Sequence, residues 1–400
     1  MNTTKIFAIT ILMSVTLFGS PLAYATSEIK DFLKDPAQLV SSDFRVKPVM
    51  MKRVGFWFDV YTKYPSTHHI IHHSRYPWIV FEVVDTSSFF KKKQAHWLEN
   101  KKALDHVKLR RKIIRQELKS LASKPFSKSL SPLQRHLKKT LQKIGGPRGN
   151  VYRFASKKVR SQTGQRNFFV KGLKNSPKYL PLMEAEFQRQ GLPKELLRIP
   201  FVESSFNEKA ESRVGASGIW QIMPHIGKAY MKVTPHIDER NSPIKATEVA
   251  GKILKQNFRA LKSWGLAVTA YNHGIGGLRK SLRKSKSTHL TQLISHYRGG
   301  SFGFASSNFY ASFLAALHAE TYKDQIFSSD EISPRPALNA QMVTLHRSMR
   351  PSQIAKLANL NIDDLKDLNH DIKRAIKNDI RLPKGFRVFL PHNSQFIGSN

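Results

Sequence analysis

Residues 192–224 read LPKELLRIPFVESSFNEKAESRVGASGIWQIMP. Pro193 suits the first turn of a helix, and the mainly apolar residues 196–202 lead directly to Glu203. A carboxyl group beside buried apolar side chains keeps its proton more readily than it does in water. A general acid needs that proton near neutral pH. The stretch therefore predicts a helix that presents Glu203 as a catalytic acid; the alternative for a single Glu at a helix end is a cap or a surface ion pair.

A glycine-rich segment follows Glu203. Residues 215–218 read GASG and lead into Trp220 and Gln221. Glycine lets backbone pass close to a ligand, Trp offers a flat apolar face for a sugar ring, and Gln offers a donor and an acceptor. Residues 270–274 (AYNHG) add Tyr271 and Asn272 before a flexible turn. Each feature alone also suits a buried core residue or a helix end, but together they predict a carbohydrate-binding groove.

In order and spacing these residues resemble the family 1 lytic transglycosylases, which share a goose-lysozyme-like fold, and most closely the membrane-bound lytic murein transglycosylase D type. The resemblance covers about residues 155–320, with residues 159–181 similar to the lead-in of that subgroup. It rests on these elements: Glu203-Ser204, Asn207, Ser212, Gly215-Ala216, Gly218-Ile219-Trp220-Gln221, Pro224 and Ala270-Tyr271-Asn272.

The resemblance implies that Glu203 is the sole catalytic carboxylate. It implies substrate contacts from Ser212, Gly218, Trp220, Gln221, Tyr271 and Asn272. The family also has a Tyr in a later helix; alignment on the phrase FLA at 313–315 puts Phe309 there, with Tyr310 next to it. We take Tyr310 as the candidate and leave Phe309 as the alternative. His273 stands where the family has a small residue.

The implied reaction, like that of glycoside hydrolase family 23, cleaves the β-1,4 bond between N-acetylmuramic acid and N-acetylglucosamine in peptidoglycan. Most glycosidases use two carboxylates, whereas this family uses one, first as acid and then as base, and leaves 1,6-anhydromuramoyl ends. A hydrolase that leaves lysozyme-type ends, on normal or deacetylated wall, and a catalytically silent wall-binding protein remain as alternatives. The resemblance implies no cofactor and no metal.

The N-terminus is typical of a secretory signal. Lys5 precedes the apolar residues 6–18, and Ala23-Tyr24-Ala25 is a small-x-small cleavage site. The apolar run is shorter than the roughly 20 residues that span a bilayer, so we expect cleavage near Ala25 rather than an uncleaved anchor. We therefore expect the protein in the periplasm or cell envelope, or secreted. The sequence contains no Cys, which excludes disulfides and thiolate metal sites.

The chain has a net charge of +38, and the excess is concentrated in residues 91–150, with 18 Lys or Arg and three acidic residues. Such a segment attracts polyanions. For an exported protein we expect anionic envelope polymers as partners and no nucleic acid; the alternative is a solvated basic helical face. Lys91, Lys92, Lys93, Arg110 and Arg111 are among its basic residues.

We expect residues 26–150 to form a basic α+β and helical region. Within it, residues 54–61 (VGFWFDVY) and 78–85 (WIVFEVVD) have strand composition and predict a hairpin-like pair. The intervening His68, His69, His72 and His73 are interpreted as a polar loop, with metal binding as the alternative. Residues 91–145 are helical in composition, and Gly145-Gly146-Pro147 ends that pattern.

Amphipathic segments dominate residues 151–325, so we expect a mainly α, lysozyme-like catalytic domain there. Residues 326–339 have the composition of a linker. Residues 340–392 then predict a β-α-α-β order: strand-like 341–346, helices at 351–359 and 362–369, and strand-like 386–391. This order and the phrases at 365–369, 382–386 and 390–391 resemble a LysM-type peptidoglycan-binding module; a structural cap on the catalytic domain is the alternative.

Overall fold

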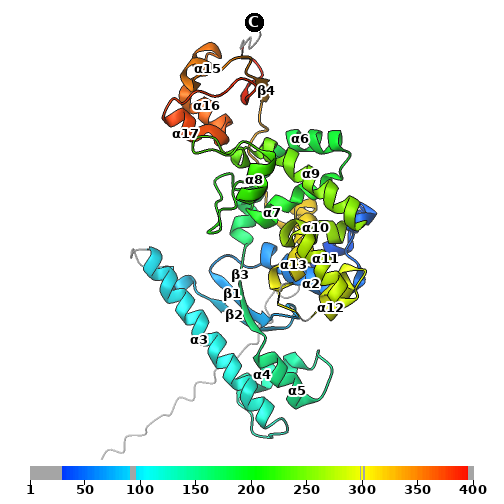
Figure 1. The fold of residues 1–400 in the computed structure, drawn as a ribbon. Coiled ribbons are helices and arrows are strands. Elements are labelled where there is room, and N and C mark those ends of the chain that lie inside the picture. Colours follow the sequence, from blue (N-terminus) through cyan, green and yellow to red (C-terminus); the bar gives the residue numbers. More distant parts are fainter. Residues whose placement is uncertain (1–28, 91–95, 298, 301, 395–400) are drawn as a thin grey trace, which may run out of the picture.

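The computed structural model describes residues 29–90, 96–297, 299–300 and 302–394. A helical body occupies the centre of the molecule, an arm that contains the long helix α3 extends from one side, and a small C-terminal module adjoins the other (Figure 1). The predicted signal peptide, residues 1–25, lies outside the described residues. None of the described helices is both long enough and apolar enough to cross a membrane.

The body is mainly helical, as the sequence predicts. One hydrophobic core runs through it and includes Phe58, Phe169, Trp220 and Phe313, all fully buried. Its elements are α2 (Met51–Thr62), α6 (Arg166–Gln190), α7 (Ile199–Glu203), α8 (Pro224–Tyr230), α9 (Pro243–Leu261), α10 (Trp264–His273), α11 (Ile275–Ser285), α12 (Leu290–His296), α13 (Phe304–Thr321) and α14 (Lys323–Ile326).

Helix α2 corrects a prediction, because residues 54–61 form a helix rather than a strand. Eight of its twelve residues are buried, including Arg53 and Gly55. A helix that is enclosed on nearly all sides is apolar all round and loses its 3.6-residue pattern. A short apolar run of that kind cannot be distinguished from a buried strand by periodicity.

A three-stranded antiparallel sheet joins the body to the arm. Its order is β2-β1-β3, with β1 (His68–His73) in the centre, β2 (Val80–Asp85) on one side and β3 (Val159–Thr163) on the other. The prediction for 78–85 is confirmed over 80–85, but its partner is β1 and not residues 54–61. Ile70 packs into the core of the body and Ile71 into that of the arm, as alternation along a strand requires.

The four His residues therefore lie in a central strand, and the polar-loop interpretation is wrong. His72 packs between the rings of Phe56 and Phe304, at centroid distances of 4.7 and 5.5 Å. Burial lowers the pKa of His72 to about 3 and that of His73 to about 4, so both are neutral at pH 7. The described part of the chain contains no group of three or more His, Asp or Glu side chains placed to hold a metal ion.

The arm consists of α3 (His96–Ser123), α4 (Pro132–Leu141) and α5 (Arg148–Ser156). The predicted helical region and the break at Gly145-Gly146-Pro147 are confirmed, because the break separates α4 from α5. These helices and the sheet share a second hydrophobic core, which contains Ile114 and Leu137. The predicted boundary at residue 150 does not separate two cores, because buried residues from Leu33 to Ile70 on one side of it and from helices such as α6, α9 and α13 on the other belong to the core of the body.

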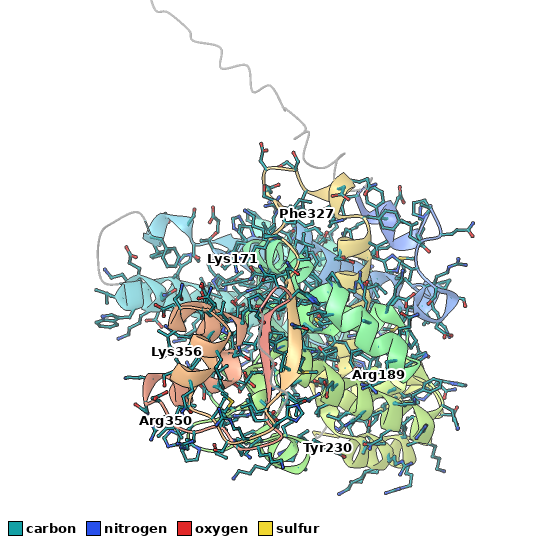
Figure 2. All side chains as sticks on the ribbon, turned by 90° about the horizontal axis from the view of Figure 1, so that it is seen from above. Lys171, Arg189, Tyr230, Phe327, Arg350 and Lys356 are labelled. Carbon is teal, nitrogen blue, oxygen red and sulfur yellow. The ribbon has the colours of Figure 1, made fainter. Side chains whose placement is uncertain are left out.

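The C-terminal module has the predicted strand-helix-helix-strand order. It consists of β4 (Ala340–Thr344), α15 (Pro351–Leu357), α16 (Ile362–Leu368) and β5 (Arg387–Pro391), with a further short helix α17 (Lys373–Lys377) before β5. β4 and β5 pair antiparallel, and the module has its own hydrophobic core. Figure 2 looks down on the molecule from the side of this module, with Arg350 and Lys356 labelled on it.

Two ion pairs attach the module to helix α9. Lys245 contacts Asp371 at 2.6 Å in a buried position, and Arg387 contacts Glu248 at 2.8 Å. Residues 326–339, predicted as a linker, contain no helix or strand after α14. They run beside α6, where the backbone N–H groups of Arg335 and Leu338 donate to carbonyl groups of that helix.

Candidate active site

Glu203 is the last residue of the short helix α7. The helix is anchored by Ile199 and Phe201, which are almost fully buried, and the chain before it by an ion pair between Arg198 and Glu320 at 2.9 Å. Burial raises the pKa of Glu203 to about 8. The desolvated carboxyl group therefore keeps its proton at neutral pH, as a general acid requires.

Glu203 lies on the wall of a pocket of about 530 Å³. The wall combines aromatic surface with amides and hydroxyls, a composition suited to a sugar. Glu203 is the only carboxylate among its lining residues, which are Trp57, Tyr61, Arg160, Gln162, Gln165, Phe168, Phe201, Val202, Glu203, Ser204, Ser205, Asn207, Asn272, Phe304, Ala305, Asn308, Phe309 and Ser312.

Other carboxylates near Glu203 in sequence lie elsewhere. Glu208, Glu211 and Asp238 line a second cavity of about 250 Å³, which faces the C-terminal module. Glu239 contacts Lys245 at 3.1 Å. The geometry therefore supplies one acid to the pocket and no second carboxylate of the kind that two-acid glycosidases place across the bond.

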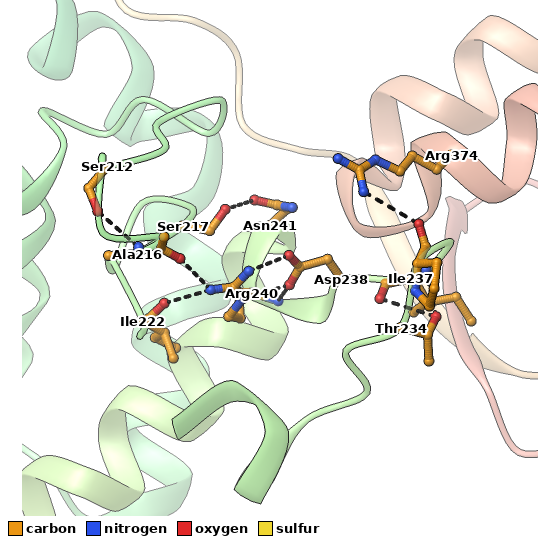
Figure 3. A network of polar contacts seen from close by, with 12 residues as sticks. Ser212, Ala216, Ser217, Ile222, Thr234, Ile237, Asp238, Arg240, Asn241 and Arg374 are labelled. Atoms are coloured by element: carbon orange, nitrogen blue, oxygen red, sulfur yellow. Dashed lines mark hydrogen bonds and ion pairs between the residues drawn. The ribbon is translucent and has the colours of Figure 1, made fainter. Parts of the chain in front are cut away.

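The glycine-rich segment is held in place by Arg240, which lies at the centre of the network in Figure 3. Its guanidinium donates to the carbonyl oxygens of Gly215 at 2.7 Å and Ile222 at 3.2 Å, and it pairs with Asp238 at 2.7 Å. Gly218 has a φ of +75°, and a Cβ atom there would lie 2.0 Å from the backbone oxygen of Arg240. The glycine is therefore required for close backbone packing.

Ser212 and Gln221 brace the same loop from within. The Ser212 hydroxyl accepts a hydrogen bond from the backbone N–H of Ala216 at 2.9 Å. The Gln221 amide donates to the carbonyls of Ala210 and Gly218 at 3.2 and 2.9 Å. Neither residue is among those that line the Glu203 pocket, so their predicted contact with substrate stays a prediction.

Trp220 corrects a prediction, because its ring is fully buried and presents no face to a sugar. It stacks on Phe187, and its indole N–H donates to Thr247 at 2.8 Å. Its full burial in the hydrophobic core of the body makes this Trp a core residue. Its backbone carbonyl accepts a hydrogen bond from the Tyr271 hydroxyl at 2.9 Å. Burial raises the pKa of Tyr271, and the nearby charge of Glu203 raises it further.

Asn272 is the one predicted substrate-binding residue that lines the pocket. Its side-chain oxygen accepts a weak hydrogen bond from Ser306 at 3.4 Å. His273, next to it, contacts the same Ser306 hydroxyl at 2.9 Å, and burial lowers the pKa of this His. The unusual residue at position 273 thus helps to hold the start of α13 beside Asn272.

Tyr310 does not line the pocket, whereas Phe309 does, so the substrate contact predicted for Tyr310 stays a prediction. The ring of Tyr310 stacks on Phe313, and its hydroxyl is directed to the carbonyl of Asp43 at 3.5 Å. Successive residues on a helix point about 100° apart, so only one of the pair can face Glu203.

Sequence reasoning missed the second wall of the pocket. Trp57 and Tyr61 come from α2, and Arg160 comes from β3. Asn308 and Ser312 come from α13. The spacing of Trp57 and Tyr61 by four residues was a usable signal, because residues i and i+4 share a face of a helix. That signal was lost when the segment was interpreted as a strand.

Comparison with known proteins agrees with this geometry. Residues 181–294, which include Glu203, the glycine-rich loop and the Tyr271-Asn272 pair, match the family model described as the transglycosylase SLT domain. Residues 181–294 are therefore similar to a transglycosylase SLT domain.

The similarity continues beyond the SLT domain in one curated relative. The membrane-bound lytic murein transglycosylase D of Escherichia coli strain K12 is 26% identical over 208 residues, which cover 49% of this chain and 43% of that protein. A putative tributyltin chloride resistance protein of Alteromonas sp. strain M-1 is 32% identical over 110 residues, or 27% of this chain and 53% of that protein. The chain thus matches about half or less of the length of these relatives.

Among solved structures, an inactive mutant of the lytic transglycosylase Slt from Pseudomonas aeruginosa aligns with a TM-score of 0.32 and 15% identity, covering 56% of this chain and 38% of that one. The 70 kDa soluble lytic transglycosylase of Escherichia coli aligns with a TM-score of 0.33 and 17% identity, covering 77% and 45%.

Proposed function

We propose that this protein is a lytic transglycosylase that cleaves the β-1,4 bond between N-acetylmuramic acid and N-acetylglucosamine in peptidoglycan. The observation that carries the proposal is Glu203: a desolvated carboxyl group, protonated at neutral pH, in a pocket formed in part by the segment that matches the SLT domain.

The reaction needs one proton carrier. The Glu203 carboxyl donates its proton to the oxygen that links the two sugars, and the bond between that oxygen and C1 of the muramoyl unit breaks. The resulting carboxylate takes the proton from the muramoyl C6 hydroxyl, whose oxygen bonds to C1. This closes a 1,6-anhydro ring and consumes no water. The attacking hydroxyl belongs to the same sugar, which favours the step through proximity.

The pocket supports each part of this cycle. Burial favours the protonated carboxyl at the start of the reaction. Asn272 and Asn207 offer amide groups on the wall, and Phe304 offers an aromatic face. We assign the ordering of the groove edge to Ser212, Gly218 and Gln221, which build the adjoining loop.

The test is the chemistry of the products. Purified protein is incubated with intact sacculi, and the released fragments are analysed by mass spectrometry. Lytic transglycosylation gives fragments with 1,6-anhydromuramoyl ends, and the mass of each is lower by one water molecule than that of the same fragment with a reducing end. Reducing muramic acid ends would instead establish a hydrolase, and binding without release of fragments would establish a silent wall-binding protein.

We further propose that the C-terminal module, residues 340–392, binds peptidoglycan as LysM-type modules do. Its β-α-α-β order and separate core support this role. A pull-down of the isolated module with insoluble peptidoglycan tests it. Full recovery of a folded module in the supernatant would leave only a structural role as a cap.

We also propose that the arm concentrates the enzyme on anionic polymers of the cell envelope, the compartment in which its substrate lies. Lys112 and Lys119 of α3 and Lys139 of α4 are exposed, whereas Arg110 is paired with Glu82 at 2.8 Å and serves the packing of the arm. Lys91, Lys92 and Lys93 lie outside the described residues. Binding through such charges weakens as salt shortens the Debye length to about 8 Å at 0.15 M.

A charge-matched comparison tests the arm. The triple substitution of Lys112, Lys119 and Lys139 by Gln should weaken envelope binding at low salt and leave cleavage of a short soluble glycan unchanged. The same substitution of Lys194, Lys228 and Lys252, which are exposed on the body, removes equal charge and should have the smaller effect. Equal effects of the two triple variants would show that only net charge matters.

A further inference from the structure

A phenol lines the pocket of Glu203, and it comes from outside residues 181–294. Tyr61, near the end of α2, is buried and lines the pocket. Its ring packs against Phe169, with the centroids 5.1 Å apart. Its hydroxyl is 2.5 Å from the Ser312 hydroxyl on α13, a close contact in which either group can be the donor.

Helix α2 is fixed to α13 along the whole face that carries Tyr61. Arg53 and Trp57, eight and four residues earlier, both donate to the side-chain oxygen of Asn308, at 2.8 and 3.2 Å. Residues at this spacing lie on one face of a helix. Asn308 and Ser312 are four residues apart on the partner helix, so the two contacts are in register. The Tyr61 hydroxyl therefore has a built position beside Glu203 and is not a mobile surface group.

The charge of Glu203 acts on this phenol. Burial raises the pKa of Tyr61, and the Glu203 charge raises it further, as it does for Tyr271. Arg160 of β3 lines the same pocket. Both phenols are therefore protonated at neutral pH, and a protonated phenol is a hydrogen-bond donor.

Helix α13 provides no phenol to the pocket, which leaves Tyr61 as the phenol that lines it. Phe309 faces the pocket from α13 and carries no hydroxyl, while the hydroxyl of neighbouring Tyr310 is directed away to Asp43. Among the described residues of α13 that line the pocket, Ser312 is the one that carries a hydroxyl group. This hydroxyl already contacts Tyr61.

We propose that Tyr61 is a positioning residue of the active site, whose hydroxyl turns from Ser312 to donate to the Glu203 carboxylate once that residue has given up its proton. The inference rests on the proposed function and deepens it. A carboxylate in a desolvated pocket is costly without donors, and a charge-assisted hydrogen bond is stronger than the neutral contact that it replaces. Tyr61 thereby stabilises the form of Glu203 that takes the proton in the second step.

The test is a titration of Glu203 in the full chain, followed by NMR of ¹³C-labelled Glu side chains, with Glu203→Gln to assign the signal. Tyr61→Phe keeps the ring and removes the donor. We expect the pKa of Glu203 to rise by about one unit and kcat/KM to fall about tenfold, the size expected for one hydrogen bond to a charged group. Tyr152→Phe, which alters a buried phenol in the core of the arm, should change neither quantity.

A second variant guards against a merely structural effect. Tyr61→Phe leaves the buried Ser312 hydroxyl without this partner, so Tyr61→Phe combined with Ser312→Ala removes both groups. We expect the double variant to melt like the wild type and still show the raised pKa of Glu203. A wild-type pKa in this folded double variant would overturn the proposal. Because the titration needs no turnover, a wild-type protein that cleaves no glycan would contradict the proposed function without deciding the role of Tyr61.

Discussion

The pocket around Glu203 has two walls with different origins. One consists of the end of α7, the residues that follow it up to Asn207, and Asn272 near the end of α10, all within residues 181–294. The other consists of α2, β3 and α13, which come from three separate parts of the chain outside that segment. The difference teaches that the segment matched by the family model contains the candidate acid but only part of the residues that line the pocket.

The sharpest test of the first wall is Glu203→Gln. The amide nearly preserves the shape of the side chain but cannot donate the proton, and general acid-base catalysis contributes about 10²–10⁴-fold to a rate. We expect cleavage of sacculi to fall by that factor while sedimentation with the wall is unchanged. Release of fragments at the wild-type rate would refute a single-acid mechanism.

The second wall is tested by Phe58→Ala. Phe58 is fully buried on α2 in the core that it shares with the SLT domain. The loss of a buried Phe side chain costs about 3–5 kcal/mol. We expect denaturant unfolding of the whole body at a lower midpoint, and Val49→Ala, at a residue that is 70% exposed, to have little effect. Unfolding of α2 alone, with the body intact, would show that the two walls are independent.

A smaller effect separates two glycines that have a positive φ. Gly218→Ala places a Cβ atom 2.0 Å from the Arg240 backbone oxygen, whereas Gly191→Ala, after the end of α6, enters open space at a φ of +65°. Both substitutions cost about 1–2 kcal/mol for the left-handed backbone, and Gly218→Ala adds about 1–3 kcal/mol of overpacking. Thermal unfolding of the two variants measures the difference. Equal melting temperatures would mean that the loop can move away from Arg240.

The last effect is the pH dependence of stability. The pKa of Glu203 is about 8 in the folded protein against an ordinary value of 4.5. Between those values the folded state binds more protons than the unfolded state, so Glu203 lowers stability as pH rises through that window. Glu203→Gln does not titrate and should therefore melt at a higher temperature than the wild type at pH 9, with a smaller gain at pH 5. An equal gain at both pH values would show that Glu203 is not buried as described.

The sequence predicts the first wall better than the second for a physical reason. Local features of the sequence indicate Glu203 and Asn272. Glu203 ends an apolar run, and Asn272 belongs to a polar pair that precedes a glycine turn. Tyr61 and Ser312 are 251 residues apart, and their contact depends on how α2 packs against α13. The same limit explains Trp220, because an aromatic residue beside glycines suits either a sugar platform or a core, and only its neighbours decide which.

By itself, the sequence determined the candidate acid, the glycine-rich loop that follows it, the helical character of the body and arm, and the order of elements in the C-terminal module. These depend on residue type and short-range spacing. Only the tertiary structure decided that residues 54–61 form a helix, that His68–His73 is a central strand, and that Phe309 rather than Tyr310 faces Glu203. Each of these depends on what encloses the segment, and burial is set by parts of the chain far away in sequence.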